Sequence, residues 1–277
     1  MKIFALITHT LRELIAKATL LFLAGISTLI ILVLTLSLSS KESSDGMTII
    51  VFGNPIGPAI PAEKMIELVQ LFQSGLAAGL FAGVVLFGVF ATAGIIPDML
   101  EKGTVDLYLS KPIARWELLL GKYLGAIVVV LANAIYFIGA LWLIFGLKLG
   151  VWNVQFLLSA FTLTFVFACL FSIVAHLGVA SRNMAISIIG GFLYLFVISG
   201  ALYHRERLLY LVSDNSLYRG IVDGLYYLLP QLSAMQDNII KQQITQQTMD
   251  WKPFVQSLLS SAVIFGGGII ILRRKDF

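Results

Sequence analysis

Charged residues are scarce in this sequence. Of its 277 residues, 12% are Asp, Glu, Lys or Arg, 58% are hydrophobic, and the mean hydropathy is +0.93. Soluble domains carry about one quarter charged residues, so this composition excludes a water-soluble protein. The uncharged residues fall in runs longer than the roughly 20 residues that a helix needs to cross a bilayer. The sequence therefore predicts an all-α polytopic membrane protein.

The sequence has a single cysteine and lacks a phosphate-binding motif for nucleotides. The one cysteine, Cys169, lies in an apolar run, which excludes an intramolecular disulfide and a cysteine-based zinc site. A phosphate-binding loop is absent, since Gly121-Lys122 is followed by Tyr123, so we expect no ATP, cofactor or metal in this chain. The net charge of +4 is explained by positive charge retained on one membrane face, so we expect no nucleic-acid partner.

The runs between charged residues predict six transmembrane helices. Arg182 alone separates the fourth run from the fifth, which predicts two helices joined by a tight turn at Ser181-Arg182-Asn183. The expected spans are residues 18–40, 70–97, 123–147, 156–180, 183–203 and 253–272.

The distribution of Lys and Arg predicts the orientation of these spans. With the N-terminus inside, the inner segments hold 11 Lys and Arg in 49 residues, and the outer segments hold 8 in 84. Positive charge is retained on the cytoplasmic side of short loops, so we expect both termini to be cytoplasmic. The inner segments are 1–17, 98–122, 181–182 and 273–277.

The segment before the first span has a helical apolar pattern of its own. Ile3, Ile7, Leu11 and Leu14 recur at helical spacing, with charged residues on other faces. This pattern predicts an amphipathic helix over 1–17 that lies in the inner membrane interface. The alternative is a cleavable signal peptide with a small-x-small site at residues 37–39, which the long apolar run disfavours.

Two outer loops differ in character. The 41–67 loop is rich in Gly, Pro and Ser, so we expect irregular structure there. The 204–252 loop is too long for an unstructured connection, and we expect short extracytoplasmic helices in it. Its apolar run 221–229 has three possible roles: to lie against the outer leaflet, to close the mouth of a pathway, or to anchor the chain in the interface.

Three polar side chains within the expected spans are candidates for a functional role. His176, Cys169 and Asn133 are the candidates for contact with a transported substrate, although an interhelical hydrogen bond is the simpler role for His176. Ser172 lies four residues before His176, which allows an intramembrane serine hydrolase, but an acidic partner and an oxyanion motif are missing from the neighbouring sequence. Glycine recurs every four residues at Gly75, Gly79 and Gly83. This spacing predicts close helix packing or a subunit contact.

The longest inner loop, 98–122, combines charge with helix boundaries. Gly103-Thr104 can end one helix and start another, and Pro112 ends the second. The short helix between them carries apolar residues surrounded by charges of both signs. This pattern is typical of an element that docks on another protein.

The same loop resembles the E-x-G-T-x-x-x-L-L-S-x-P-I-S-R-x-E-x-x-x-G-K segment of ABC-2 type transporter permeases, with Tyr108 and Ala114 differing from it. The resemblance implies a permease dimer, either a homodimer or a pseudo-dimer with a second permease, that binds a separate ATPase holding ATP and Mg. The subgroup it looks closest to is that of the nitrous-oxide reductase maturation permease. The implied ATPase interface is Glu101, Gly103, Thr104, Leu107, Leu109, Ser110, Pro112, Ile113, Arg115 and Glu117.

These observations favour the permease subunit of an ATP-driven exporter in the cytoplasmic membrane of a bacterium, without catalytic activity of its own. The alternative is an ion-coupled secondary transporter, which the scarcity of charge within the expected spans disfavours. A pathway lined in this way cannot stabilise a bare metal ion, so we expect an amphipathic or lipid-like substrate.

Overall fold

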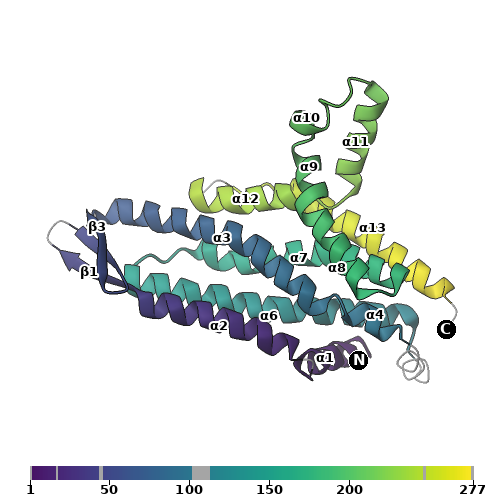
Figure 1. The fold of residues 1–277 in the computed structure, drawn as a ribbon, viewed down its shortest axis with the longest axis horizontal. Helices are drawn as coiled ribbons and strands as arrows, with labels where there is room; N and C mark the ends of the chain where they lie inside the picture. The colour runs from purple at the N-terminus through teal and green to yellow at the C-terminus, as the bar shows by residue number, and fades with distance from the viewer. Residues whose placement is uncertain (1, 17, 44–45, 102–112, 246–247, 276–277) are drawn as a thin grey trace.

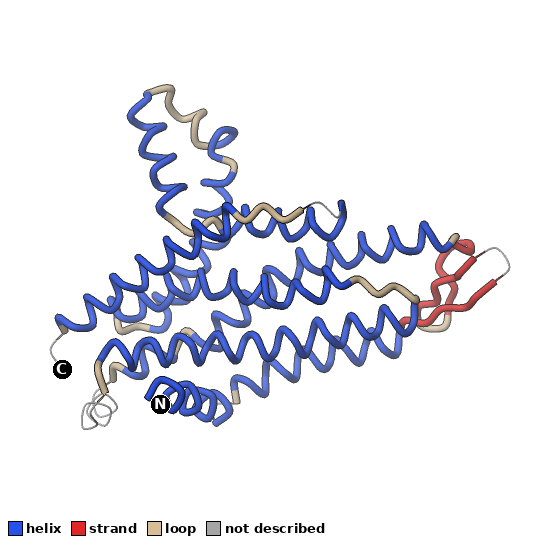
Figure 2. Tube along the Cα trace, turned by 180° about the vertical axis from the view of Figure 1, so that it is seen from behind, coloured by secondary structure: helices blue, strands red, loops and turns tan. Residues whose placement is uncertain are grey.

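The chain folds mostly into long helices. A computed structural model describes residues 2–16, 18–43, 46–101, 113–245 and 248–275. The longest helices run side by side, with both chain termini at one end of the bundle and a small sheet at the other (Figures 1 and 2). We call these the terminal end and the sheet end.

The first half of the chain contains α1 (Lys2–Ala16), α2 (Thr19–Ser37), β1 (Leu38–Ser43), β2 (Gly46–Val51), β3 (Asn54–Ile60), α3 (Ala62–Thr92), α4 (Ile95–Met99) and α6 (Arg115–Leu149). The second half contains α7 (Val154–Ser181), α8 (Met184–Leu193), the π-helical turn η1 (Tyr194–Ile198), α9 (Ser199–Tyr203), α10 (Arg205–Leu208), α11 (Ser216–Leu228), α12 (Leu232–Thr245) and α13 (Lys252–Arg274).

Among the described residues, five helical segments are long and apolar enough to cross a membrane. They coincide with the first, third, fourth, fifth and sixth expected spans. The second expected span falls on α3, whose residues 68–92 are uncharged, and its crossing of the membrane stays a prediction. The five segments are Leu20–Ser37, Arg115–Leu149, Val154–Ser181, Met184–Tyr203 and Lys252–Arg274.

The helix α6 begins earlier than its charges suggest. We expected the span to start at residue 123, after Lys122, but the helix already begins at Arg115. A helix of 35 residues is about 52 Å long, which exceeds the hydrocarbon core of a bilayer. The helix α6 is therefore longer than a bilayer crossing requires.

The turn between α7 and α8 lies where the sequence places it. Arg182 adopts a left-handed conformation with φ of 55°, which ends α7. The Asn183 side chain then accepts hydrogen bonds from the backbone N–H groups of Ala185 and Ile186, and so caps α8. Two residues are thus enough to reverse the chain.

The segment 38–60 corrects the expectation of irregular structure, and it is an exception to the all-α fold. It forms an antiparallel sheet of order β1-β2-β3. The central strand β2 has the β-branched run Thr48 to Val51, which favours a strand. Pro55 and Pro58 occur in β3, an edge strand of this sheet, where a missing N–H donor is tolerated.

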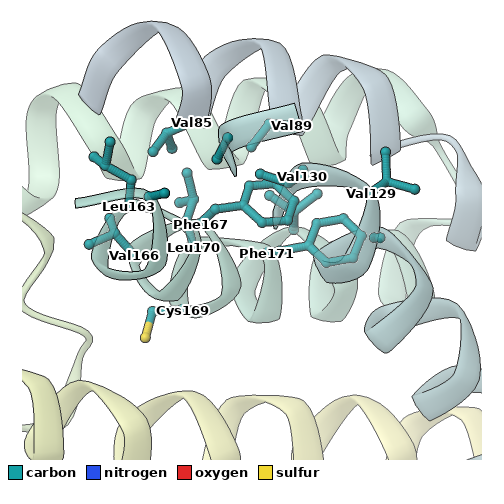
Figure 3. Close-up of a cluster of buried hydrophobic side chains, with 14 of the residues drawn as sticks. Val85, Val89, Val129, Val130, Leu163, Val166, Phe167, Cys169, Leu170 and Phe171 are labelled. Atoms are coloured by element: carbon teal, nitrogen blue, oxygen red, sulfur yellow. The ribbon is translucent and has the colours of Figure 1, made fainter. Parts of the chain in front are cut away.

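The core lies where α3, α6 and α7 meet. Val85 and Val89 of α3 face Phe167 and Phe171 of α7, as Figure 3 shows, and all four are buried. Gly88 allows this approach, since a Cβ there would lie 3.0 Å from the Phe167 ring. The interior of the bundle is therefore held by apolar packing.

The helix α1 packs across the start of α6. A Cβ at Gly121 would lie 2.5 Å from Leu6 Cβ, and a Cβ at Gly125 would lie 2.6 Å from Thr10 Cβ. The contacting Leu6, Thr10 and Leu14 are buried, whereas Phe4 and Ile15 are exposed. The interfacial position expected for this helix remains a prediction.

The segment 204–252 contains α10, α11 and α12. The helix α12 packs against α3 and α7, whereas α10 and α11 extend away from the bundle (Figure 1). Tyr194 donates a hydrogen bond to the Pro230 carbonyl at 2.7 Å, and Ser199 bonds Ser233 at 2.9 Å. These contacts hold the start of α12 against the η1 turn.

Gly125→Ala tests the packing of α1 on α6. The added methyl group meets Thr10 Cβ, so we expect a loss of about 1–3 kcal/mol in stability and a lower unfolding temperature in detergent. Gly139→Ala is the matched control in the same helix, with nothing within 4 Å of the new Cβ, and alanine is the better helix former. Equal unfolding temperatures for the two variants would contradict close packing of α1.

Candidate functional site

The predicted ATPase interface is only partly within the described residues. Gly103, Thr104, Leu107, Leu109, Ser110 and Pro112 lie outside them. Glu101, Ile113, Arg115 and Glu117 are described and flank that segment at the terminal end. Their role in binding an ATPase remains a prediction, but their contacts within the chain can be stated.

Glu101 and Glu117 differ in environment. Glu101 is exposed directly after the buried helix α4 and Leu100. Glu117 instead accepts a hydrogen bond from the backbone N–H of Ala114 at 2.9 Å, and the Leu118 N–H donates to the Ala114 carbonyl. Glu117 thus helps to fix the first turn of α6, where a negative charge is also favoured by the helix dipole.

Arg115 connects the start of α6 to the end of α13. Its guanidinium Nη1 donates to the carbonyl oxygens of Leu272 at 3.2 Å, Arg273 at 3.4 Å and Lys275 at 2.6 Å. The last carbonyls of a helix lack partners within it, and a cation is favoured there. Arg115 therefore caps α13 from another helix.

Lys275 extends this connection to α7. Its Nζ donates to the carbonyl oxygens of Val179 and Ala180, the latter at 2.9 Å, in the last turn of that helix. Burial, and then the nearby Arg182, lower the pKa of Lys275 from its ordinary value. Positive side chains are thus concentrated where three helices end or begin.

Lys122 connects α6 to α1. Its side chain is 2% exposed and its Nζ forms an ion pair with Glu13 Oε2. His9 Nδ1 lies 4.0 Å from the same carboxylate oxygen. A buried ammonium group requires a partner of opposite charge, so α1 is held to α6 by this pair as well as by the glycine contacts.

The result is a set of polar contacts that we name the terminal network, defined by Glu13, Arg115, Glu117, Lys122 and Lys275. It joins α1, α6, α7 and α13 at the terminal end, where α6 begins. The network thus connects the first turn of α6 to three other helices. The sequence singled out Arg115 and Glu117, but it carries no signal for their partners.

His176 makes the interhelical hydrogen bond that its position predicts. Its Nδ1 lies 3.0 Å from the carbonyl oxygen of Ile264 in α13. A carbonyl can only accept, so Nδ1 carries the proton in this bond. The ring lines a cavity of about 380 Å³ together with Tyr194, Ile198 and Gly267.

Ser172 and Asn133 make hydrogen bonds elsewhere in the bundle and are not among the residues that line this cavity. Ser172 Oγ donates to the Cys169 carbonyl at 2.7 Å within α7, so its hydroxyl is engaged in the helix backbone. Asn133 bonds Ser27 at 3.3 Å across the contact of α6 with α2. Within the part of the chain that is described, groups of three or more His, Cys, Asp or Glu suited to a metal ion are absent.

A larger groove opens between α2, α3 and α6. It has a volume of about 500 Å³ and its wall is apolar. Gly75 and Gly79 of α3 face open space there, since a Cβ on either would meet nothing within 4 Å. The lining residues are Ile30, Leu71, Phe72, Gly75, Leu76, Gly79 and Phe137.

Comparison with known proteins identifies the family of this chain. A family model described as ABC-2 family transporter protein matches residues 49–277, which is most of the chain. The protein is therefore a multi-pass membrane subunit of an ABC transporter. More particularly, it belongs to the ABC-2 family, whose members work with an ABC ATPase and are not themselves catalytic. A search of curated proteins finds no match.

Paired substitutions of Glu13 and Lys122 test the terminal network. Glu13→Gln leaves the Lys122 ammonium buried beside a neutral group, so we expect a loss of roughly 3–5 kcal/mol in stability. Adding Lys122→Met removes the buried charge, so the double variant should unfold at a higher temperature than Glu13→Gln alone. Thermal unfolding in detergent measures both, and additive losses would contradict a direct pair.

Proposed function

We propose that this protein is the permease of an ATP-driven exporter, and that a separate ATPase docks on residues 101–117. The observation that supports this best is the terminal network, because it links the predicted docking segment to four helices of the bundle. A site that only recruited an ATPase would need a surface, whereas force transmission also needs firm contacts behind that surface.

The proposed mechanism is mechanical. The partner ATPase binds ATP and Mg, closes, and displaces the segment between α4 and α6. Arg115, Glu117 and Lys122 pass this displacement to α13 and α1, and the bundle changes between two packed states. In this proposal six helices cross the cytoplasmic membrane of a bacterium, α3 is the second of them, and both termini are cytoplasmic.

The groove between α2 and α3 is the proposed pathway. The two helices expose many apolar side chains, and the apolar wall with its open glycines suits an amphipathic or lipid-like substrate better than an ion. We propose that two copies of the chain enclose the pathway between them. We also propose that the protein is related to the nitrous-oxide reductase maturation subgroup, which the resemblance of its loop motif supports.

Glu101→Lys tests the docking surface. Glu101 is exposed, so reversal of its charge should leave the unfolding temperature unchanged and reduce the amount of ATPase that co-purifies with the permease. Glu63→Lys is the matched control, an exposed acid at the sheet end in the first turn of α3. Wild-type recovery of the ATPase with Glu101→Lys would count against this segment as the contact.

A further inference from the structure

A second cavity lies where α7, α13 and the η1 turn meet. It is the cavity of about 380 Å³ that His176 lines, and its described lining residues differ from those of the groove between α2, α3 and α6. Small-molecule sites have volumes of about 300–1,000 Å³. The cavity is therefore large enough for a ligand of its own, independent of the proposed pathway.

The η1 turn forms one wall of this cavity. The Ser199 N–H donates to the carbonyl of Tyr194, five residues earlier, so the chain makes a π-helical turn there. Such turns within α-helices occur frequently at functional sites. Tyr194 and Ile198, both in this turn, line the cavity, and the Tyr194 hydroxyl is already engaged with the Pro230 carbonyl. The turn thus contributes an aromatic ring and an aliphatic side chain to the wall.

The wall of the cavity is apolar and uncharged. Six of the nine lining residues are Ile, Leu or Val, and charged side chains are absent from the lining residues that the structure describes. A charged ligand would therefore be buried without a partner. A buried water molecule needs about two to four polar partners, which this wall does not supply. The cavity thus suits a neutral and mainly apolar molecule.

His176 gives the wall one hydrogen-bond acceptor. Its Nδ1 donates to the Ile264 carbonyl at 3.0 Å, so Nε2 of the neutral imidazole is an acceptor. Within the described part of the chain, Nε2 makes no hydrogen bond. Gly267 makes room for the ring, since a Cβ there would lie 3.2 Å from His176 Cε1. A ligand that fits this wall therefore carries one hydrogen-bond donor.

The cavity opens to the outside of the bundle at the middle of α13. Val263 lines it and is 67% exposed. This residue is the centre of α13, about 16 Å from each end of a helix that is suited to cross a membrane. Because the hydrocarbon core of a bilayer is about 30 Å thick, the opening faces acyl chains. A ligand thus enters from the membrane and not from water.

We propose that this cavity binds a membrane-soluble molecule with an apolar body and a single hydroxyl group, such as a long-chain alcohol. The hydroxyl donates to His176 Nε2, and the apolar body lies against Ile173, Ile198 and Val263. An ordinary acyl chain, or an apolar side chain from a second copy of the protein, would leave Nε2 without a donor in an apolar surrounding, which is costly. This cost favours the hydroxyl-bearing ligand over both.

Photolabelling of the full-length protein in phosphatidylcholine vesicles tests the proposal. The probe is decanol with a diazirine on its chain, and the matched control probe is its methyl ether, which has no donor. His176→Asn keeps an amide N–H near the position of Nδ1 but has no atom at the position of Nε2. Val263→Trp fills the opening, and Leu259→Trp is its control, four residues earlier and also exposed but outside the cavity. Mass spectrometry locates the labelled residues.

We expect saturable labelling of the cavity residues by the alcohol, about twofold to tenfold stronger than labelling by the ether, which is the effect of one hydrogen bond. His176→Asn should reduce labelling by the alcohol to the level of the ether. Val263→Trp should reduce labelling by both probes, and Leu259→Trp should leave it unchanged.

Two results would overturn the proposal. Equal labelling of the natural protein by the alcohol and the ether would show that the cavity takes ordinary acyl chains, and this comparison needs no variant. Disulfide-linked dimers of Val263→Cys under mild oxidation would show that a second copy covers the opening. Cys169 is buried, so the natural chain is the background for that measurement.

Discussion

The need to neutralise one buried lysine determines much of the terminal end. Lys122 is almost fully inaccessible in a largely apolar bundle, and an unpaired ammonium group there would cost several kcal/mol. Its partner Glu13 belongs to α1, so α1 must lie within ion-pair distance of α6. Gly121 and Gly125 make that approach possible, since any side chain there would collide with Leu6 or Thr10.

The ends of the other long helices are connected in a similar way. Arg115 caps α13, Lys275 caps α7, and at the sheet end Lys148 donates to the carbonyls of Thr35 and Leu38 at the end of α2. Unpaired carbonyls are costly near lipid, so each of these cations stabilises a helix end and also joins two helices. Polar contacts at the ends and apolar packing between them suit rigid elements that move as units.

The sequence predicts the long helices well and their contacts poorly. Runs without charge locate five helical segments, four of them within a few residues, and misplace the start of α6 by eight residues. Arg182 marks the turn between two of the five. The sheet is missed because β1 is polar and β3 contains Pro55 and Pro58, so only β2 has the sequence of a strand. The other two strands form because they pair with β2. The partners of Arg115 and Lys122 are missed because each partner is about 100 or more residues away in the sequence. Only the packing of the helices brings these residues together.

In the proposed mechanism, ATP-driven movement at the terminal end reaches the groove between α2 and α3. Leu71 lines that groove and is 63% exposed, so a spin label on Leu71→Cys reports on it in the assembled complex with the ATPase. We expect the distance distribution between the labels of two copies to shift when the nucleotide-free complex is trapped with ATP and vanadate. An unchanged distribution in a complex that hydrolyses ATP would contradict it.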